Sequence, residues 1–145
     1  MNRLRTFAAT APTTLVLALV LAACGGSATP TPEAVKATPA PGAQVITITS
    51  SEDGEKYSFN PSALTLKPGQ QVVVRLVNAA GSTKSHGFQL KAADGTDIVK
   101  SEVVKAGASL DIPFTVPAAG KYQFLCFQRG HADRGQTGTL TSSAS

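Results

Sequence analysis

Three side chains in the segment Cys126–Gln136 are able to bind a metal or take part in a reaction. Cys126 carries a thiol, His131 an imidazole and Gln136 a carboxamide, at intervals of five residues. A run with β-strand character lies on each side of the segment. A loop between two strands is a place where a rigid sheet can direct several side chains toward one point. The spacing therefore predicts a site in which these three groups converge.

His86, the other histidine of the chain, lies far upstream of this segment. One cysteine thiolate, two imidazoles and a fourth donor form the ligand set of mononuclear copper electron-transfer sites. We therefore predict a copper site made of His86, Cys126 and His131, with Gln136 as the axial ligand. The alternative for Gln136 is a position at the rim of a three-coordinate site. An axial carboxamide oxygen is a harder donor than a thioether sulfur, so it should lower the reduction potential.

Each residue also has an interpretation that involves no copper. Cys126 could be a buried structural thiol, and His86 a histidine of the core. Zinc could occupy the same three ligands and would give a colourless protein. Cys126 could also be a nucleophile with His131 as its base, but no acid is placed to orient His131 and no oxyanion loop is evident. We therefore predict that the protein is not an enzyme.

Alternation along the flanking strands indicates where the two outer ligands point. Side chains alternate between the two faces of a strand, so residues two apart share a face. Apolar residues share a face with both ligands: Phe88 and Leu90 with His86, and Tyr122 and Phe124 with Cys126. We therefore expect both ligands to point into the same interior, near the ends of their strands.

Short β-type runs separated by turn residues fill the chain from Gln44 onward. The expected strands are residues 45–49, 56–59, 63–67, 71–78, 86–91, 109–116, 121–125 and 137–141. Residues 98–104 fit either an irregular strand or a short helical turn. Val73 and Val77 make both faces of 71–78 partly apolar, as in a central strand, and Pro113 places 109–116 at an edge. About eight strands and no helix predict an all-β fold, a Greek-key β-sandwich.

The N-terminal part has the pattern of an export signal followed by a tether. Residues 1–23 begin with positive charge and continue as an apolar stretch, as signal peptides do. They end in Leu21-Ala22-Ala23-Cys24, which resembles the lipobox of bacterial lipoproteins. We expect a signal peptide at 1–23, a lipid on Cys24, a flexible Ala/Thr/Pro linker at 24–43 and the folded domain at 44–145. An ordinary cleaved signal, with Cys24 incidental, is the alternative.

Export and lipidation restrict what Cys126 can do. If the lipid takes Cys24, Cys126 is left without a disulfide partner in an oxidising compartment. A disulfide between the two cysteines is the competing account. The net charge is +4, and it becomes lower when Arg3 and Arg5 are removed with the signal peptide. The chain also has no run of basic residues, so no nucleic-acid partner is expected. We expect a monomer anchored to a bacterial membrane on its periplasmic or outer face.

Several stretches share their order and spacing with a known family. They are Phe59-Asn60-Pro61, Leu64–Gly69, Val72–Asn78, His86-Gly87-Phe88, Gly120–Cys126, Gly130-His131 and Gly135–Leu140. Over residues 57–140 the chain resembles the plastocyanin/azurin-like cupredoxins, the blue copper proteins. The resemblance implies one copper ion, cycling between Cu(I) and Cu(II), on the predicted ligands.

Two positions depart from the family pattern. The usual axial Met is replaced by Gln136, which resembles the stellacyanin-type variant. The residue after the first histidine is usually Asn, whose side chain ties the ligand loops together, but here it is Gly87. Another group must therefore support the ligand loops.

The predicted function is that of an electron carrier. We expect it to move single electrons between membrane-associated redox proteins, a donor and an acceptor, with His131 as the electron exit because it lies in the loop. Copper storage or delivery without redox cycling is the alternative. Intense visible absorption and a reversible reduction potential would separate the two functions.

Overall fold

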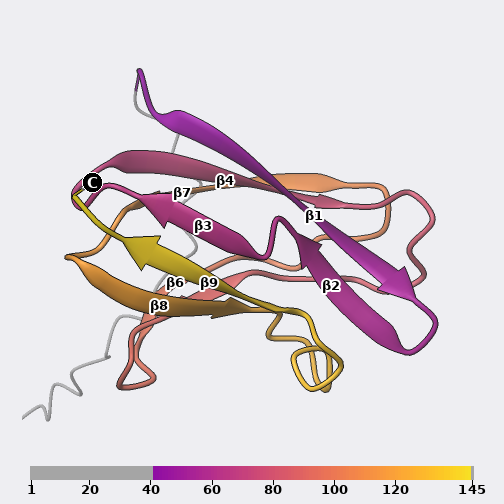
Figure 1. The fold of residues 1–145 in the computed structure, drawn as a ribbon. Helices are drawn as coiled ribbons and strands as arrows, with labels where there is room; N and C mark the ends of the chain where they lie inside the picture. Colours follow the sequence, from indigo (N-terminus) through magenta and orange to yellow (C-terminus); the bar gives the residue numbers. More distant parts are fainter. Residues whose placement is uncertain (1–40, 145) are drawn as a thin grey trace, which may run out of the picture. The chain divides into compact units, whose positions relative to one another are not determined.

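The computed structural model describes residues 41–144, and within them it contains β-strands and no helix (Figure 1). The nine strands are β1 Gln44–Asp53, β2 Lys56–Asn60, β3 Ala63–Leu66, β4 Gln71–Asn78, β5 Gln89–Lys91, β6 Asp97–Lys100, β7 Ser109–Thr115, β8 Gly120–Leu125 and β9 Thr137–Ser142. Among these residues no helix has the length and apolar character needed to cross a membrane. The predicted signal peptide, Cys24 and residues 24–40 of the predicted linker lie outside the described residues.

The strands form two sheets that face each other as a sandwich. One sheet has the order β2-β1-β4-β7 and the other β3-β9-β8-β5-β6, and the two layers are visible in Figure 1. β1 pairs with β4 in parallel, as β3 does with β9, and the other neighbours are antiparallel. The predicted all-β sandwich is confirmed.

One strand more is present than the sequence predicted. It is β6, in the part that fits either an irregular strand or a helical turn. Ile98 and Val99 are both half-buried, so the alternation that marks a strand is missing from the sequence. β6 pairs only with β5, and the register shifts at Leu90 and Lys91. A shifted edge strand of this kind leaves little periodic pattern in the sequence.

The predicted places of two strands are confirmed. β4 lies between β1 and β7, and β7 lies at the edge of its sheet. Val73 of β4 is paired with Pro113 of β7. Proline has no N–H to donate, and an edge strand has one side on which no donor is needed.

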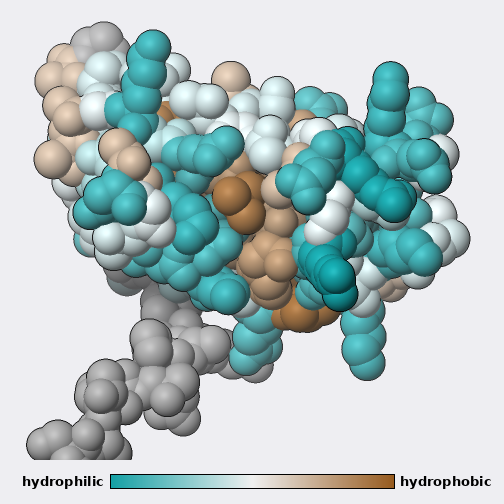
Figure 2. Space-filling view, turned by 90° about the horizontal axis from the view of Figure 1, so that it is seen from below, coloured by the Kyte–Doolittle hydropathy of each residue, from teal (hydrophilic) through white to brown (hydrophobic). Residues whose placement is uncertain are grey.

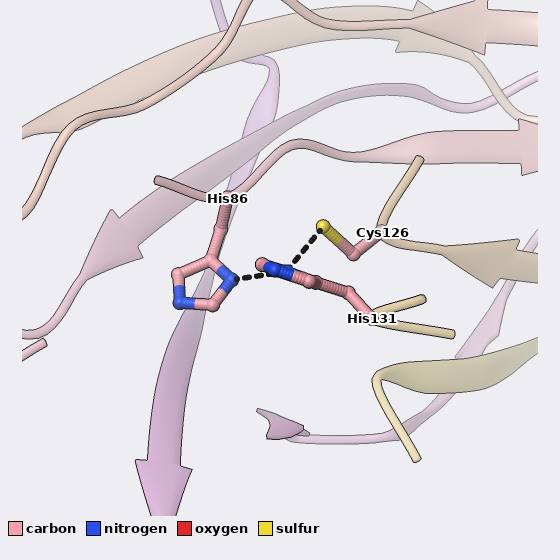
Figure 3. A group of neighbouring side chains, drawn as sticks. All are labelled: His86, Cys126 and His131. Carbon is pink, nitrogen blue, oxygen red and sulfur yellow. Dashed lines mark hydrogen bonds between the residues drawn. The ribbon is translucent and has the colours of Figure 1, made fainter. Parts of the chain in front are cut away.

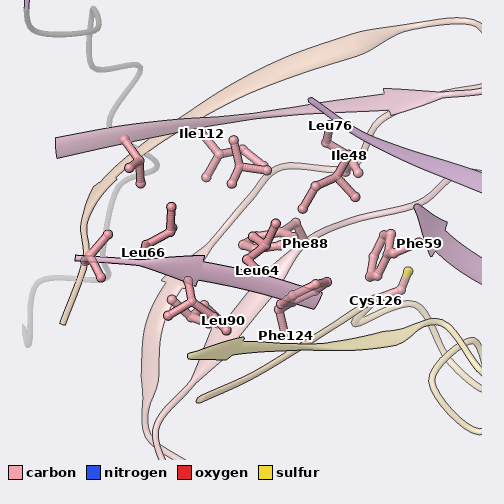
Figure 4. Packing of buried hydrophobic residues seen from close by; sticks show 14 of the residues in the cluster. Ile48, Phe59, Leu64, Leu66, Leu76, Phe88, Leu90, Ile112, Phe124 and Cys126 are labelled. Carbon is pink, nitrogen blue, oxygen red and sulfur yellow. The ribbon is translucent and has the colours of Figure 1, made fainter. Parts of the chain in front are cut away.

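Apolar side chains from both sheets fill the space between the layers. Figure 4 shows Ile48, Leu76 and Ile112 from one sheet opposite Leu64, Leu90 and Phe124 from the other. The rings of Phe88 and Phe124 stack with centroids 5.4 Å apart, and the ring of Phe59 lies 5.7 Å from that of Phe124. Cys126 belongs to the same buried cluster as these aromatic rings.

The face of the domain in Figure 2 is mostly hydrophilic, with a hydrophobic strip that runs from its centre to its lower edge. Among the described residues the exposed large hydrophobic side chains are Val45 and Val103. The apolar residues of the domain are therefore concentrated in the core.

Candidate metal site

Cys126 follows the last residue of β8 and is buried, with 1% of its surface exposed. Its backbone N–H donates to the carbonyl of Gln136 at 3.0 Å, which closes the loop between β8 and β9 at its base. Phe124 is fully buried while Lys121 and Gln123 are exposed. The alternation that predicted an inward-pointing Cys126 is confirmed.

The loop after Cys126 holds its shape through its own backbone hydrogen bonds. The N–H of His131 donates to the carbonyl of Gln128 at 3.0 Å, and the N–H of Gln136 donates to the carbonyl of His131 at 3.1 Å. Gly130 and Gly135 have φ angles of 76° and 104°, a region that favours glycine. These turns bring His131 and Gln136 back over the end of β8.

His86 comes from a different part of the fold. The expected strand 86–91 begins only at Gln89, so the predicted start was wrong by three residues. His86 instead forms an isolated antiparallel bridge with Val104, with N–H to carbonyl distances of 3.0 and 2.7 Å. The bridge is separate from the pairing of β5 with β6 because the N–H of Phe88 donates to the hydroxyl of Ser101 rather than to a backbone carbonyl. The N–H of Ser101 in turn donates to the carbonyl of Phe88. His86 is fully buried, as its alternation with Phe88 and Leu90 predicted.

The ligand atoms of these three residues converge (Figure 3). His86 Nδ1 lies 3.2 Å from His131 Nδ1, and Cys126 Sγ lies 3.5 Å from His131 Nδ1. The three ligand atoms all lie within 4.8 Å of one another. Donors that are each about 2.0–2.3 Å from one ion are themselves about 3–4 Å apart. The cluster therefore has the dimensions of a site for one metal ion.

Gln136 brings its amide oxygen to the same place. Its Oε1 lies 2.9 Å from His86 Nδ1 and 3.2 Å from His131 Nδ1. Its Nε2 points the other way and donates to the carbonyl of Ser58 at 3.5 Å. Gln136 is fully buried. The structure thus brings together all four side chains that the sequence singled out; whether Gln136 coordinates a metal stays a prediction.

Burial shifts the pKa values of Cys126 and His131. It raises the pKa of the Cys126 thiol, and the backbone N–H groups of Gly87 and Gln128 act in the opposite direction. Burial and the neighbouring His86 lower the pKa of His131, against a hydrogen bond with Gln136. Metal ligands must be deprotonated. His131 is therefore ready as a neutral donor, whereas Cys126 must lose a proton when a cation binds.

Phe127 explains why glycine follows His86. A Cβ atom on Gly87 would lie 2.3 Å from Cε1 of the Phe127 ring, so the ring occupies the space of a side chain there. The N–H of Gly87 also donates to Cys126 Sγ at 3.3 Å. Lys100 Nζ lies over the Phe127 ring, 4.8 Å from its centroid. The backbone at Gly87 thus contacts the ligand loop directly.

Asn78 supports the His86 segment from the end of β4. It is fully buried, and its Nδ2 donates to the carbonyls of Lys84 and Val104 at 2.9 and 3.0 Å. The carbonyl of Val104 also accepts the N–H of His86. Asn78 therefore ties both chain segments of the bridge together, a role that the sequence analysis missed. An asparagine ending an apolar strand was the available signal.

Tyr57 packs against the two imidazoles and was also missed. Its ring centroid lies 4.3 Å from that of His131 and 5.9 Å from that of His86. Its backbone N–H donates to the carbonyl of Arg134 at 3.0 Å, and the Arg134 guanidinium lies 5.6 Å from its ring. The start of β2, which follows the turn from β1, thus contacts the ligand loop, at the right in Figure 1. The buried pair Tyr57 and Phe59 on β2 was the signal for this contact.

Comparison with known proteins gives consistent matches. The family described as a cupredoxin-like domain matches residues 14–141. Auracyanin-A of Chloroflexus aurantiacus is 26% identical in an alignment 139 residues long; the match spans 79% of this chain and 84% of that protein.

Solved structures share the fold. Auracyanin B matches with a TM-score of 0.64 and 23% identity, covering 77% of this chain and 95% of that one. Auracyanin A, described as a "blue" copper protein from the green thermophilic photosynthetic bacterium Chloroflexus aurantiacus, matches with a TM-score of 0.61 and 23% identity over 70% of this chain and all (100%) of that one. The multicopper oxidase McoA of Aquifex aeolicus shares the fold at a TM-score of 0.59, with this chain covering 31% of it.

Proposed function

This chain belongs to the cupredoxin-like family, and we propose that it is a mononuclear blue copper protein that carries single electrons. The observation that carries the proposal is the convergence of Cys126 Sγ, His86 Nδ1 and His131 Nδ1 within 4.8 Å. Gln136 Oε1 is the proposed fourth donor. The similarity to auracyanins, one of them described as a blue copper protein, supports the same function.

The donor set fits one copper ion. A thiolate and two imidazoles suit copper, which outcompetes the other divalent first-row metals for such ligands. When bound, copper supplies a one-electron couple between Cu(I) and Cu(II). The chain's own part is to keep the donors in place, and the buried loop and the His86 bridge do this through backbone hydrogen bonds. Fixed ligands limit the rearrangement that accompanies each change of oxidation state.

His131 is the proposed passage for the electron. Its exposed fraction is 9%, whereas those of His86 and Gln136 are 0% and that of Cys126 is 1%. It also lies in the loop at one end of the sandwich, where a redox partner can approach. The remaining donors are shielded by the core, which keeps water away from the site.

Reconstitution with Cu(II) tests the proposal. We expect intense visible absorption, an electron paramagnetic resonance spectrum typical of a thiolate-bound copper, and a reversible one-electron wave in voltammetry. A colourless protein that binds copper without a reversible potential would contradict electron transfer and favour storage or delivery. Oxidase activity of the loaded protein toward small reductants, with oxygen consumed, would instead favour an enzyme.

The lipid anchor is part of the proposal and is supported by the sequence pattern ending at Cys24. A carrier fixed by lipid on an exported domain would exchange electrons with redox proteins of the same membrane. Mass spectrometry of the N-terminal peptide from a membrane fraction should find diacylglycerol on Cys24. An unmodified, soluble mature protein would contradict the anchor while leaving the copper site untouched.

A further inference from the structure

One nitrogen of the proposed copper site is buried without a hydrogen bond in the described residues. It is Nε2 of His86, the ring atom opposite the ligand atom Nδ1. A buried polar group normally has a partner, because its desolvation is costly otherwise. The group that faces it is the carboxylate of Glu52 on β1, whose Oε1 lies 3.4 Å away. The Glu52 side chain is itself 15% exposed.

The Glu52 carboxylate is held in place by the segment that carries His86. Its Oε1 accepts the backbone N–H groups of Thr83 and Lys84 at 3.0 and 2.7 Å, and its Oε2 accepts the Thr83 hydroxyl at 3.0 Å. All three contacts donate hydrogens to the carboxylate, so they favour its ionised form and fix its orientation beside the imidazole.

We propose that Glu52 is a positioning residue for the copper ligand His86: its carboxylate accepts the Nε2–H of His86 and favours the oxidised state of the site. This inference rests on the proposed function. A carboxylate behind a metal-binding histidine fixes the tautomer and orientation of the ring and makes it a more basic ligand. With the proton on Nε2, Nδ1 is free to face Cys126 and His131. The negative charge beside the ring stabilises Cu(II) more than Cu(I).

Support for the Thr83–Lys84 loop is a separate role that any acceptor could fill. Glu52→Gln keeps an oxygen for the two N–H groups of Thr83 and Lys84 and removes the charge. If Glu52 acts on His86, the Gln variant should have a higher reduction potential than the wild type. We expect a shift of the redox equilibrium of about tenfold, which is about 59 mV for one electron.

Glu55→Gln is the matched control, because Glu55 is exposed in the turn between β1 and β2. It makes the same charge change at an exposed position, where solvent and salt screen the charge, and should leave the potential close to that of the wild type. Thermal unfolding of all three apo proteins reports whether the loop is intact. A potential of Glu52→Gln equal to that of Glu55→Gln would overturn the proposal.

A second measurement depends on neither colour nor redox activity. In the Zn(II)-substituted wild type, nuclear magnetic resonance should show a slowly exchanging, downfield Nε2 proton on His86 that moves upfield in Glu52→Gln. A rapidly exchanging His86 Nε2 proton in the wild type would overturn the proposal even if the variant failed to fold. Failure of the proposed function looks different: the wild type itself would lack the visible band and the reversible wave.

Discussion

The two segments that bring ligands to the site are built in opposite ways. The loop 126–136 is held by hydrogen bonds between residues close in sequence, such as His131 to Gln128. The segment 83–87, which carries His86, is held by residues far away in the chain. His86 bonds to Val104, 18 positions away in the chain (104 − 86), and Lys84 bonds to Glu52, 32 positions away. The loop thus draws most of its hydrogen bonds from its own backbone and is joined to β2 through Tyr57 and Ser58, whereas the segment 83–87 is held mainly by other parts of the sandwich.

Exposure follows the same division. His86 is fully buried, and His131 keeps a 9% exposed edge. The long-range contacts around His86 fix a ligand that no partner can reach, and the compact loop presents the ligand that a partner can approach. In this arrangement the requirement for rigidity and the requirement for access fall on different residues.

Replacing Cys126 should have the largest effect on the site. Cys126→Ser removes the thiolate, and we expect complete loss of the intense visible band of the copper-loaded protein. The apo fold should survive, because the loop is held by backbone bonds that serine keeps. Absorption and circular dichroism spectra of the two proteins measure both outcomes. Colour that persists in the variant would show that the loop does not supply the thiolate ligand.

Removing the side chain that supports the His86 segment should lower the stability of the protein and change the geometry of the copper site. Asn78→Ala leaves the carbonyl of Lys84 without this buried donor and opens a gap beneath the bridge between His86 and Val104. We expect the free energy of unfolding to fall by about 1–3 kcal/mol, with a changed paramagnetic resonance spectrum of the Cu(II) protein. Denaturant titration measures the first and spectroscopy the second.

Gln128→Ala is the comparison within the loop. Its backbone carbonyl, which the variant keeps, accepts the N–H of His131. We therefore expect a smaller loss of stability and an unchanged spectrum. Equal effects of the two substitutions would contradict the distinction between a self-contained loop and a dependent segment.

The same distinction explains what the sequence could predict. Cys126, His131 and Gln136 are close together in the chain, so their spacing alone indicated a site. His86 was chosen as the other histidine of the chain, and its alternation with Phe88 and Leu90 predicted that it points inward. Alternation likewise predicted the sandwich, except at β6, where Ile98 and Val99 are both half-buried.

The supporting residues could not be found in this way. Asn78 and Glu52 act on a segment that only the folded sheets bring near them, and neither has a spacing that marks it. Gly87 stood out as a departure from the family pattern. The reason for a glycine there is the ring of Phe127, which fills the space of a side chain and comes from the loop that follows β8. Contacts of this kind depend on three-dimensional packing, which sequence periodicity does not contain.

The smallest expected effect is that of the fourth donor, which belongs to the loop but lies against the distant His86. Gln136→Met replaces the amide oxygen near both imidazoles by a thioether sulfur. A softer axial ligand favours Cu(I), so we expect the reduction potential to rise, by about 59 mV for each tenfold change in the redox equilibrium. The visible band should remain, because Cys126 is unchanged, and voltammetry measures the shift. An unchanged potential would mean that Gln136 does not contact the metal and serves only to connect the loop to Ser58. The loop would then supply two donors to the site, Cys126 and His131, and the buried amide would be one more structural support.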